Sequence, residues 1–205
     1  VVMRSRSTYD HAIRNIGVKM ITVTTTEEVG RALSPRTAMI YLSAGNVDLP
    51  KIAEMAKPLN IPILVDAAAE DLTVPNVHLQ QGATIVAYSG GKALCGPQCA
   101  GLLLGRKDIL MSAWQASSPH HGPGRDNKVG KEEMLGMLAA VEDWVTRDHV
   151  EKMKTWLSWL DNISKRVSSI NGVTCLVREP TGLGNRSPRL TISWDPEKFN
   201  ITGPE

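Results

Sequence analysis

The stretch ILVDAAAEDLTVPNVHLQQGATIVAYSGGKALCGPQCAGLLLGR, which spans residues 63–106, decides the fold of this chain. One apolar run covers residues 61–65 and ends at Asp66, and a second covers residues 83–88 and ends at the segment Ser89–Lys92. Continuous apolar runs of this length, bounded by turn residues, are typical of buried strands in a sheet that helices cover on both faces. Because open α/β sheets bind ligands at the carboxyl ends of their strands, we expect the carboxylate and the amine at a ligand site.

Strand and helix patterns alternate in front of this stretch. Apolar runs at residues 18–23 and 37–42 are predicted strands, and residues 26–33 and 48–57 are predicted helices. The resulting β-α-β-α-β order implies right-handed crossovers and a parallel sheet. The apolar run at residues 99–104 returns too soon for a crossover helix, so we expect it to pair antiparallel. The predicted fold class is α/β, with a mostly parallel sheet and helices on both faces.

The second half of the chain predicts long helices followed by short strands. Residues 131–170 carry apolar residues at helical spacing with few helix breakers, and short alternating strands follow them. We expect a large ligand-binding domain at residues 1–130, long connecting helices at residues 131–170, and the start of a small α+β domain at residues 171–205. The first residue is Val1 rather than Met, and we expect the large domain to be incomplete at its N-terminus and the small domain to be truncated.

Composition and charge argue against several classes of partner. A net charge of +2 is too small to indicate a nucleic-acid or membrane surface. No apolar run reaches the roughly 18 residues that a membrane helix needs, and no signal-peptide pattern is present. Three cysteines in a chain of this length do not form a disulfide framework, so we expect a cytoplasmic location. Cys95 and Cys99 do not have the usual spacing of zinc ligands, and no metal is expected.

Lys92 and Asp66 carry the chemistry that these patterns indicate. Lys92 follows Ser-Gly-Gly at a strand end, where small residues let a bulky ligand approach the backbone closely. A lysine beside a buried cationic or apolar site loses its proton more easily and can form a Schiff base. Pyridoxal phosphate needs such a lysine and also a carboxylate that keeps its ring nitrogen protonated. Asp66 is available as that carboxylate, and the hydroxyl group of Ser89 suits a phosphate oxygen.

Each of these residues also has a simpler interpretation. Asp66 can be a plain cap of the segment that follows it, and Lys92 can be a solvated surface lysine. A P-loop does not fit, because Ala93 stands where a serine or threonine would bind magnesium and because the upstream glycine spacing is wrong. The combination of an aspartate at one strand end with Ser-x-x-Lys at the next favours the pyridoxal-phosphate interpretation.

These motifs resemble those of the fold-type-I pyridoxal-phosphate enzymes. The resemblance rests on residues 65–70 (VDAAAE), 88–98 (YSGGKALCGPQ), 124–133 (GRDNKVGKEE) and 9–14 (YDHAIR). Within these enzymes the chain looks most like the group that contains selenocysteine synthase (L-seryl-tRNA selenium transferase) and D-glucosaminate-6-phosphate ammonia-lyase. The match covers nearly the whole chain, and its motifs are specific for the group but not for one substrate.

The resemblance implies a role for each matching residue. Lys92 would bind pyridoxal 5'-phosphate covalently and transfer the proton at the substrate α-carbon. Asp66 would pair with the ring nitrogen, Ser89 would help to bind the phosphate, and Gly91 would stay small beside the cofactor. Arg125 is a candidate ligand for a substrate carboxylate or phosphate, with a solvated loop residue as the alternative. His11 is a candidate cofactor contact, with a structural histidine as the alternative.

The chain also departs from the pattern of the group. Many fold-type-I enzymes place a glutamine or histidine three residues after the aspartate, near the phenolic oxygen of the cofactor, and Ala69 stands there in this chain. The N-terminal part of the family, which supplies a glycine-rich phosphate loop and a group that stacks on the ring, has no counterpart in these residues. The contact to the phenolic oxygen must therefore come from elsewhere or be missing.

The resemblance implies an enzyme that depends on pyridoxal phosphate and acts on a small amino acid or amino sugar acid by α,β-elimination, as an ammonia-lyase does. The first alternative is an L-seryl-tRNA selenium transferase, which a basic N-terminal domain in the full gene product would favour. The second alternative is a folded fragment of such an enzyme without catalytic competence. Because family members usually build their active site between two subunits, we expect a homodimer or a larger homo-oligomer.

Overall fold

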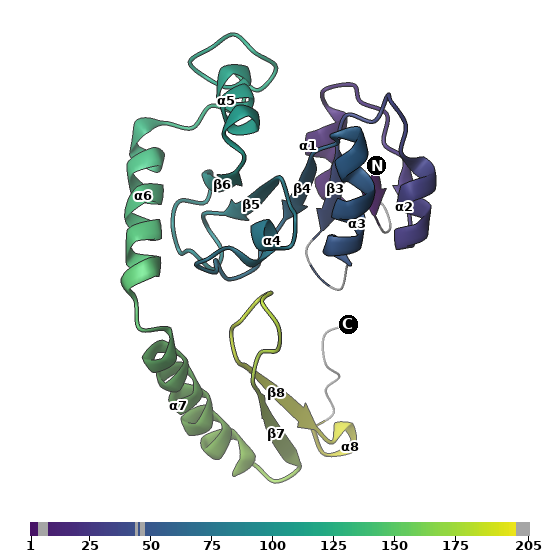
Figure 1. The fold of residues 1–205 in the computed structure, drawn as a ribbon. Coiled ribbons are helices and arrows are strands. Elements are labelled where there is room, and N and C mark those ends of the chain that lie inside the picture. The colour runs from purple at the N-terminus through teal and green to yellow at the C-terminus, as the bar shows by residue number, and fades with distance from the viewer. Residues whose placement is uncertain (4–7, 44, 46–47, 200–205) are drawn as a thin grey trace. The chain divides into compact units, whose positions relative to one another are not determined.

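The computed structural model describes residues 1–3, 8–43, 45 and 48–199. The chain divides into two compact units, Val1–Val145 and Thr146–Glu205, whose elements are labelled in Figure 1. The predicted division into residues 1–130, 131–170 and 171–205 stays a prediction. No helix in the described ranges has both the length and the apolar character that crossing a membrane requires.

The first unit is built on a sheet of six strands in the order β2-β1-β3-β4-β5-β6. The strands are β1 (Val2–Met3), β2 (Thr22–Val23), β3 (Ile40–Ser43), β4 (Ile63–Asp66), β5 (Ile85–Ser89) and β6 (Gly101–Gly105). All neighbouring pairs are parallel except β5 and β6, which are antiparallel. The parallel sheet and the antiparallel return of residues 99–104 therefore agree with the prediction. The predicted strand at residues 18–23 is shorter than expected, since only its last two residues pair as β2.

Helical elements alternate with these strands. They are η1 (Thr8–Asp10), α1 (His11–Arg14), α2 (Thr26–Ala32), α3 (Leu49–Ala56), η2 (Lys57–Leu59), α4 (Val77–Gln80), α5 (Lys107–Ala116) and α6 (Lys131–Thr146). A capping box starts α2, because Thr25 accepts from the Glu28 amide while the Glu28 side chain returns to the Thr25 amide. Asp48 caps α3 by accepting from the Lys51 amide. Local sequence signals thus fix where these two helices begin.

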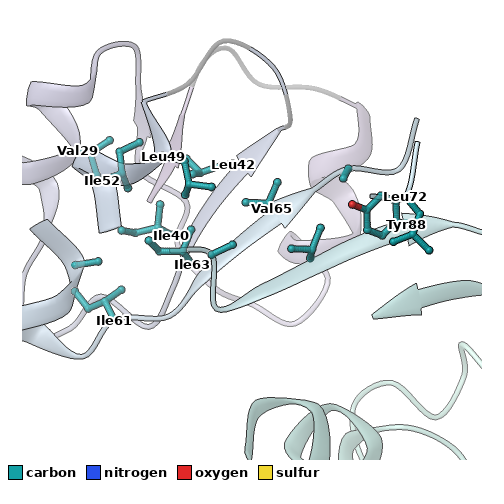
Figure 2. Packing of buried hydrophobic residues seen from close by; sticks show 14 of the residues in the cluster. Val29, Ile40, Leu42, Leu49, Ile52, Ile61, Ile63, Val65, Leu72 and Tyr88 are labelled. Carbon is teal, nitrogen blue, oxygen red and sulfur yellow. The ribbon is translucent and has the colours of Figure 1, made fainter. Parts of the chain in front are cut away.

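The core of the first unit lies between one face of the sheet and helices α2 and α3. Alternate residues of β3 and β4 supply the sheet side, and Figure 2 shows them packed with residues of both helices. The fully buried members include Val29 of α2, Ile52 of α3, and Ile40, Leu42 and Ile63 of the sheet. Burial of each such side chain contributes roughly 1.5–3 kcal/mol relative to its exposed state. The space between this part of the sheet and the two helices is therefore filled by apolar side chains.

Helix α6 belongs to the first unit because two of its residues reach the core. Met137 and Trp144 are both buried, and the indole Nε1 of Trp144 donates to the carbonyl oxygen of Leu72 at 2.8 Å. This bond ties α6 to the segment that follows β4. Trp144 thus packs within the first unit.

The second unit consists of α7 (His149–Ser168), β7 (Val173–Arg178), β8 (Arg189–Trp194) and α8 (Pro196–Phe199). Strands β7 and β8 form an antiparallel two-stranded sheet. Asp148 starts α7 by accepting from the amides of Val150 and Glu151. The helical pattern predicted over residues 131–170 is therefore two helices, α6 and α7, and the second begins at its own cap.

Candidate functional site

Polar side chains gather on one face of the sheet, at the carboxyl ends of three neighbouring strands. Tyr41 pairs in register with Leu64, Ser43 pairs with Asp66, and Asp66 pairs with Ala87. Register partners in parallel strands share a face, and side chains two residues apart along one strand share it as well. Tyr41, Ser43, Asp66 and Ser89 therefore lie on the same face, opposite the closed core. This group is called the strand-end site below.

Two hydrogen bonds fix the side chain of Asp66 in the strand-end site. It is half-buried at the end of β4. Its Oδ2 accepts a hydrogen bond from the hydroxyl group of Tyr41 at 2.6 Å, and its Oδ1 accepts from the amide of Ala68 at 3.1 Å. The second bond is the local capping contact that the simpler interpretation predicted, whereas the first comes from a different strand. The carboxylate is thus oriented by tertiary structure as well as by its own turn.

Tyr41 was not identified as a site residue from the sequence. Burial, the hydrogen bond to Asp66 and the negative charge of Asp66 raise the pKa of Tyr41 well above its usual value, and the charge of Asp10 adds to this effect. The phenol therefore keeps its proton at every pH at which the protein would be assayed. Its hydroxyl group acts as a donor to the carboxylate throughout that range.

Lys92 lies just beyond β5, three residues after Ser89. The carbonyl oxygen of Lys92 accepts from the amide of Cys95 at 2.9 Å, which closes a tight turn in which Cys95 has a φ of 57°. The lysine side chain is exposed, and its Nζ lies 5.8 Å from the centroid of the Tyr9 ring. Because β4 and β5 are adjacent and parallel, Lys92 and Asp66 emerge at the same edge of the sheet.

The glycines before Lys92 are required by packing within the turn. A Cβ on Gly91 would lie 2.4 Å from Oε1 of Gln98 and 2.9 Å from its Cα. A Cβ on Gly90 would lie 2.6 Å from the carbonyl oxygen of Pro97 and 2.8 Å from that of Ala100. Packing against Gln98 thus explains why residue 91 is a glycine without reference to any ligand. The predicted place of Gly91 beside a cofactor stays a prediction.

Replacing Gly90 by alanine is expected to destabilise the first unit by about 1–3 kcal/mol, because the two carbonyl oxygens belong to backbone that cannot move aside freely. Urea unfolding followed by circular dichroism would measure the loss as a lower midpoint. Gly124→Ala is the matched control, since the nearest atom to its Cβ would be the Ala116 carbonyl oxygen at 3.2 Å. Equal midpoints for Gly90→Ala and the parent chain would contradict this account of the turn.

A buried polar pair fixes the segment between β4 and β5. Glu70 and His78 are 8% and 9% exposed, and Oε2 of Glu70 lies 2.6 Å from Nε2 of His78. Nearby, the Asn76 side chain accepts from the Leu79 amide at the start of α4 and donates to the hydroxyl group of Tyr88 at 2.8 Å. These contacts hold the chain between the strand that carries Asp66 and the strand that leads to Lys92.

Removing one member of this pair is expected to destabilise the chain. Glu70→Ala would leave the buried His78 ring without its carboxylate partner, and an unsatisfied buried polar group costs about 1–3 kcal/mol. Glu54→Ala removes an exposed glutamate from α3 and is expected to change stability by no more than about 0.5 kcal/mol. Thermal and urea unfolding of both variants would test the difference. A Glu70→Ala variant as stable as Glu54→Ala would show that the pair contributes nothing.

The structure does not bring Arg125 to the strand-end site through any hydrogen bond. Its Nη1 donates to the carbonyl oxygen of Pro119 at 2.5 Å and to that of His120 at 3.2 Å. The His120 ring in turn contacts Trp114 edge-on, with centroids 4.4 Å apart. Arg125 thus braces the loop between α5 and α6, and its binding of substrate stays a prediction.

His11 opens α1 and is exposed, next to Asp10, which is only 1% exposed. The charge of Asp10 acts on Tyr41, so the start of α1 lies near the strand-end site. A contact between His11 and a cofactor stays a prediction. Within the described ranges, no group of three or more His, Cys, Asp or Glu side chains is arranged to hold a metal ion.

No family model matches the chain. It is 28% identical over 191 residues to 5'-C-glycyluridine monooxygenase-decarboxylase of a Streptomyces species, covering 89% of this chain and 46% of that protein. It is 28% identical over 149 residues to D-glucosaminate-6-phosphate ammonia lyase of Salmonella typhimurium, covering 69% of this chain and 38% of that protein. It is 31% identical over 106 residues to L-seryl-tRNA(Sec) selenium transferase of Proteus mirabilis, covering 46% of this chain and 22% of that protein. The chain thus spans less than half the length of these relatives.

Solved structures share the architecture of the chain. The metB protein of Corynebacterium glutamicum matches with a TM-score of 0.55 at 19% identity, over 86% of this chain and 48% of that one. Cystathionine gamma-lyase of Lactobacillus plantarum, complexed with L-serine, matches with a TM-score of 0.53 at 18% identity, over 92% of this chain and 52% of that one. At these identities the likeness shows the fold alone. It confirms the predicted α/β class.

Proposed function

We propose, from the premise that this chain belongs to the fold-type-I pyridoxal-phosphate enzyme group, that it binds pyridoxal 5'-phosphate at the strand-end site. The observation that carries the proposal is the placement of Asp66 and Ser89 on one face of two adjacent parallel strands, with Lys92 directly beyond the second. This is the edge at which open α/β sheets bind ligands. On the opposite face, apolar side chains of β3 and β4 pack against helices α2 and α3.

The side chains at this edge fit the cofactor chemically. Each oxygen of the Asp66 carboxylate accepts one hydrogen bond, which leaves lone pairs for a protonated ring nitrogen. The hydroxyl group of Ser89 is half-buried and can donate to a phosphate oxygen. Lys92 is exposed, so its amine is accessible to a carbonyl group. When bound, pyridoxal phosphate supplies an electron sink for charge that develops at the substrate α-carbon.

The residues of this chain then have separate tasks. Lys92 would hold the cofactor through its amine and would take the proton from the substrate α-carbon. Asp66 keeps the ring nitrogen protonated by holding a negative charge against it. Ser89 contributes to holding the phosphate. Arg125 is proposed to bind a carboxylate or phosphate of the substrate.

The reaction that we propose is α,β-elimination on a small amino acid or amino sugar acid. The α-proton passes to Lys92, the β-substituent leaves with the electron pair of its bond to the β-carbon, and hydrolysis of the released product gives ammonia and a 2-keto acid. The similarity to D-glucosaminate-6-phosphate ammonia lyase over 69% of the chain supports this reaction. The similarity to L-seryl-tRNA(Sec) selenium transferase supports the alternative, transfer of a selenium group to a tRNA-bound substrate.

Product analysis separates these reactions. The protein would be incubated with pyridoxal phosphate and a panel of β-hydroxy amino acids and phosphorylated amino sugar acids. A lyase yields ammonia and a keto acid in equal amounts from at least one member, whereas a selenium transferase yields product only with seryl-tRNA and a selenium donor. A chain that binds the cofactor but gives neither product, nor any exchange of the α-proton in heavy water, is the catalytically incompetent fragment.

We further propose that the active protein is a homodimer or a larger homo-oligomer in the cytoplasm. Exposed apolar residues on α6 and on α7 could contact another subunit and so support this proposal. They are Leu135, Leu138, Val150 and Trp159. Light scattering of the purified protein, with and without pyridoxal phosphate, would give its mass. A monomer under both conditions would contradict this part of the proposal.

A further inference from the structure

Tyr41 has a position and a partner that the proposed function does not use. It lies on β3, one strand away from Asp66, and the residue is only 8% exposed. Its hydroxyl group reaches across to Oδ2 of Asp66 at 2.6 Å, a contact between residues 25 positions apart in the chain. The register that pairs Ser43 with Asp66 places Tyr41 on the same face as the carboxylate.

Burial and charge both stabilise the hydrogen bond between Tyr41 and Asp66. Tyr41 is a buried residue, so its hydroxyl group has little freedom to turn away from Asp66. Since burial and the nearby carboxylates raise the pKa of Tyr41, the proton stays on the phenol and the bond keeps its direction. Hydrogen bonds to charged groups are stronger than those between neutral groups. The Ala68 amide fixes the other oxygen, so the plane of the carboxylate is determined.

We propose that Tyr41 is a positioning residue, which holds the Asp66 carboxylate in the orientation that receives the protonated ring nitrogen of pyridoxal phosphate. The inference rests on the proposed function. Tyr41 itself touches neither the cofactor nor the substrate and acts through Asp66. Without its hydroxyl group the carboxylate keeps its charge but can rotate about its bond to Cβ. It then spends part of its time in orientations that do not meet the ring.

The test compares two cofactors that differ only at the ring nitrogen. Dissociation constants would be measured by fluorescence or absorbance titration for pyridoxal phosphate and for its 1-deaza analogue, in which a carbon replaces that nitrogen. The parent chain, Tyr41→Phe and Tyr88→Phe would be titrated side by side. Tyr88→Phe is the matched control, because Tyr88 is also buried in the sheet but its hydroxyl group accepts from Asn76 instead of contacting Asp66.

Tyr41→Phe is expected to weaken binding of pyridoxal phosphate by about tenfold or more while leaving binding of the deaza analogue within about twofold of the parent chain. Tyr88→Phe is expected to change both constants by the same factor. In an Asp66→Ala background, Tyr41→Phe is expected to have no further effect on pyridoxal phosphate, because the two residues act as one unit.

Several results would overturn the inference. If Tyr41→Phe weakens the binding of both cofactors equally, Tyr41 only supports the fold. If the binding of both cofactors is unchanged, the hydrogen bond has no role in binding. If the parent chain binds neither cofactor, the proposed function fails and the inference fails with it. If Tyr41→Phe does not fold, 3,5-difluorotyrosine at position 41 retains the ring and donates more strongly. This variant must then bind pyridoxal phosphate more tightly relative to the deaza analogue than the parent chain does. An unchanged ratio of the two dissociation constants overturns the inference.

Discussion

Lys92→Ala is expected to stop exchange of the substrate α-proton almost completely. In the proposed function the side chain is both the covalent anchor of the cofactor and the base at the α-carbon, and a general base alone contributes about 10²–10⁴-fold. Exchange in heavy water, followed by nuclear magnetic resonance on the substrate identified by product analysis, measures this step without requiring the complete reaction. We expect the rate for Lys92→Ala to fall by at least this factor.

Two controls separate the loss of the amine from other effects. Lys92→Arg retains a positive charge but removes the nucleophilic amine, so it is expected to lose as much as Lys92→Ala. Lys107→Ala removes an exposed lysine at the start of α5 and is expected to retain the parent rate. Added methylamine should restore part of the exchange in Lys92→Ala, because a small amine can replace the missing base. Full exchange in Lys92→Ala would assign the chemistry to another lysine.

Asp66→Asn is expected to produce the second largest loss, about 10²–10³-fold in α-proton exchange. The substitution preserves the size of the side chain and an oxygen that can accept from Ala68 or Tyr41, but it removes the negative charge that favours a protonated ring nitrogen. Preorganised electrostatic groups at reacting centres commonly contribute effects of this size. The cofactor would remain attached to Lys92, so attachment and exchange should separate in this variant.

The comparison that isolates the charge is Asp66→Asn against Asp108→Asn. Asp108 is an exposed carboxylate that pairs with Arg106, away from the strand-end site. The parent rate is expected for Asp108→Asn. If Asp66→Asn also exchanges at the parent rate, the carboxylate does not face the ring nitrogen, and the assignment of the strand-end site is wrong.

The sequence predicts the parts of the fold that local patterns determine. Apolar runs that end in polar residues located β4 and β5, and the short return at residues 99–104 predicted the antiparallel β6. The helices predicted at residues 26–33 and 48–57 correspond to α2 and α3, which the structure shows to be capped by Thr25 and Asp48. Long helices were predicted over residues 131–170 without a position for the break between them, and the Asp148 cap of α7 marks that position.

Contacts between strands could not be predicted in the same way. Tyr41 belongs to an apolar run, and only the register between β3 and β4 shows that it faces Asp66. Nothing in the local pattern distinguishes it from the core residues beside it. The Glu70 and His78 pair likewise depends on how the segment between β4 and β5 folds back on itself. Asp10 lies in a short polar segment, and its burial follows from tertiary packing.

The proposed roles of Lys92 and Asp66 rest on motif and topology together. The motif places an aspartate at one strand end and a lysine beyond the next, and the parallel pairing of β4 and β5 brings both to one edge. The motif by itself does not identify the substrate, because the relatives that the chain matches have names that describe different reactions. Product analysis must supply that information.

The most direct measurement is chemical trapping of the cofactor on the chain. The protein would be incubated with pyridoxal phosphate, reduced with borohydride, digested and mapped by mass spectrometry. We predict a single phosphopyridoxyl group on Lys92 and none on Lys107 or on any residue of the Lys92→Ala variant. A group found on another lysine, or no group on a folded chain, would contradict the claim that the strand-end site is a pyridoxal-phosphate site.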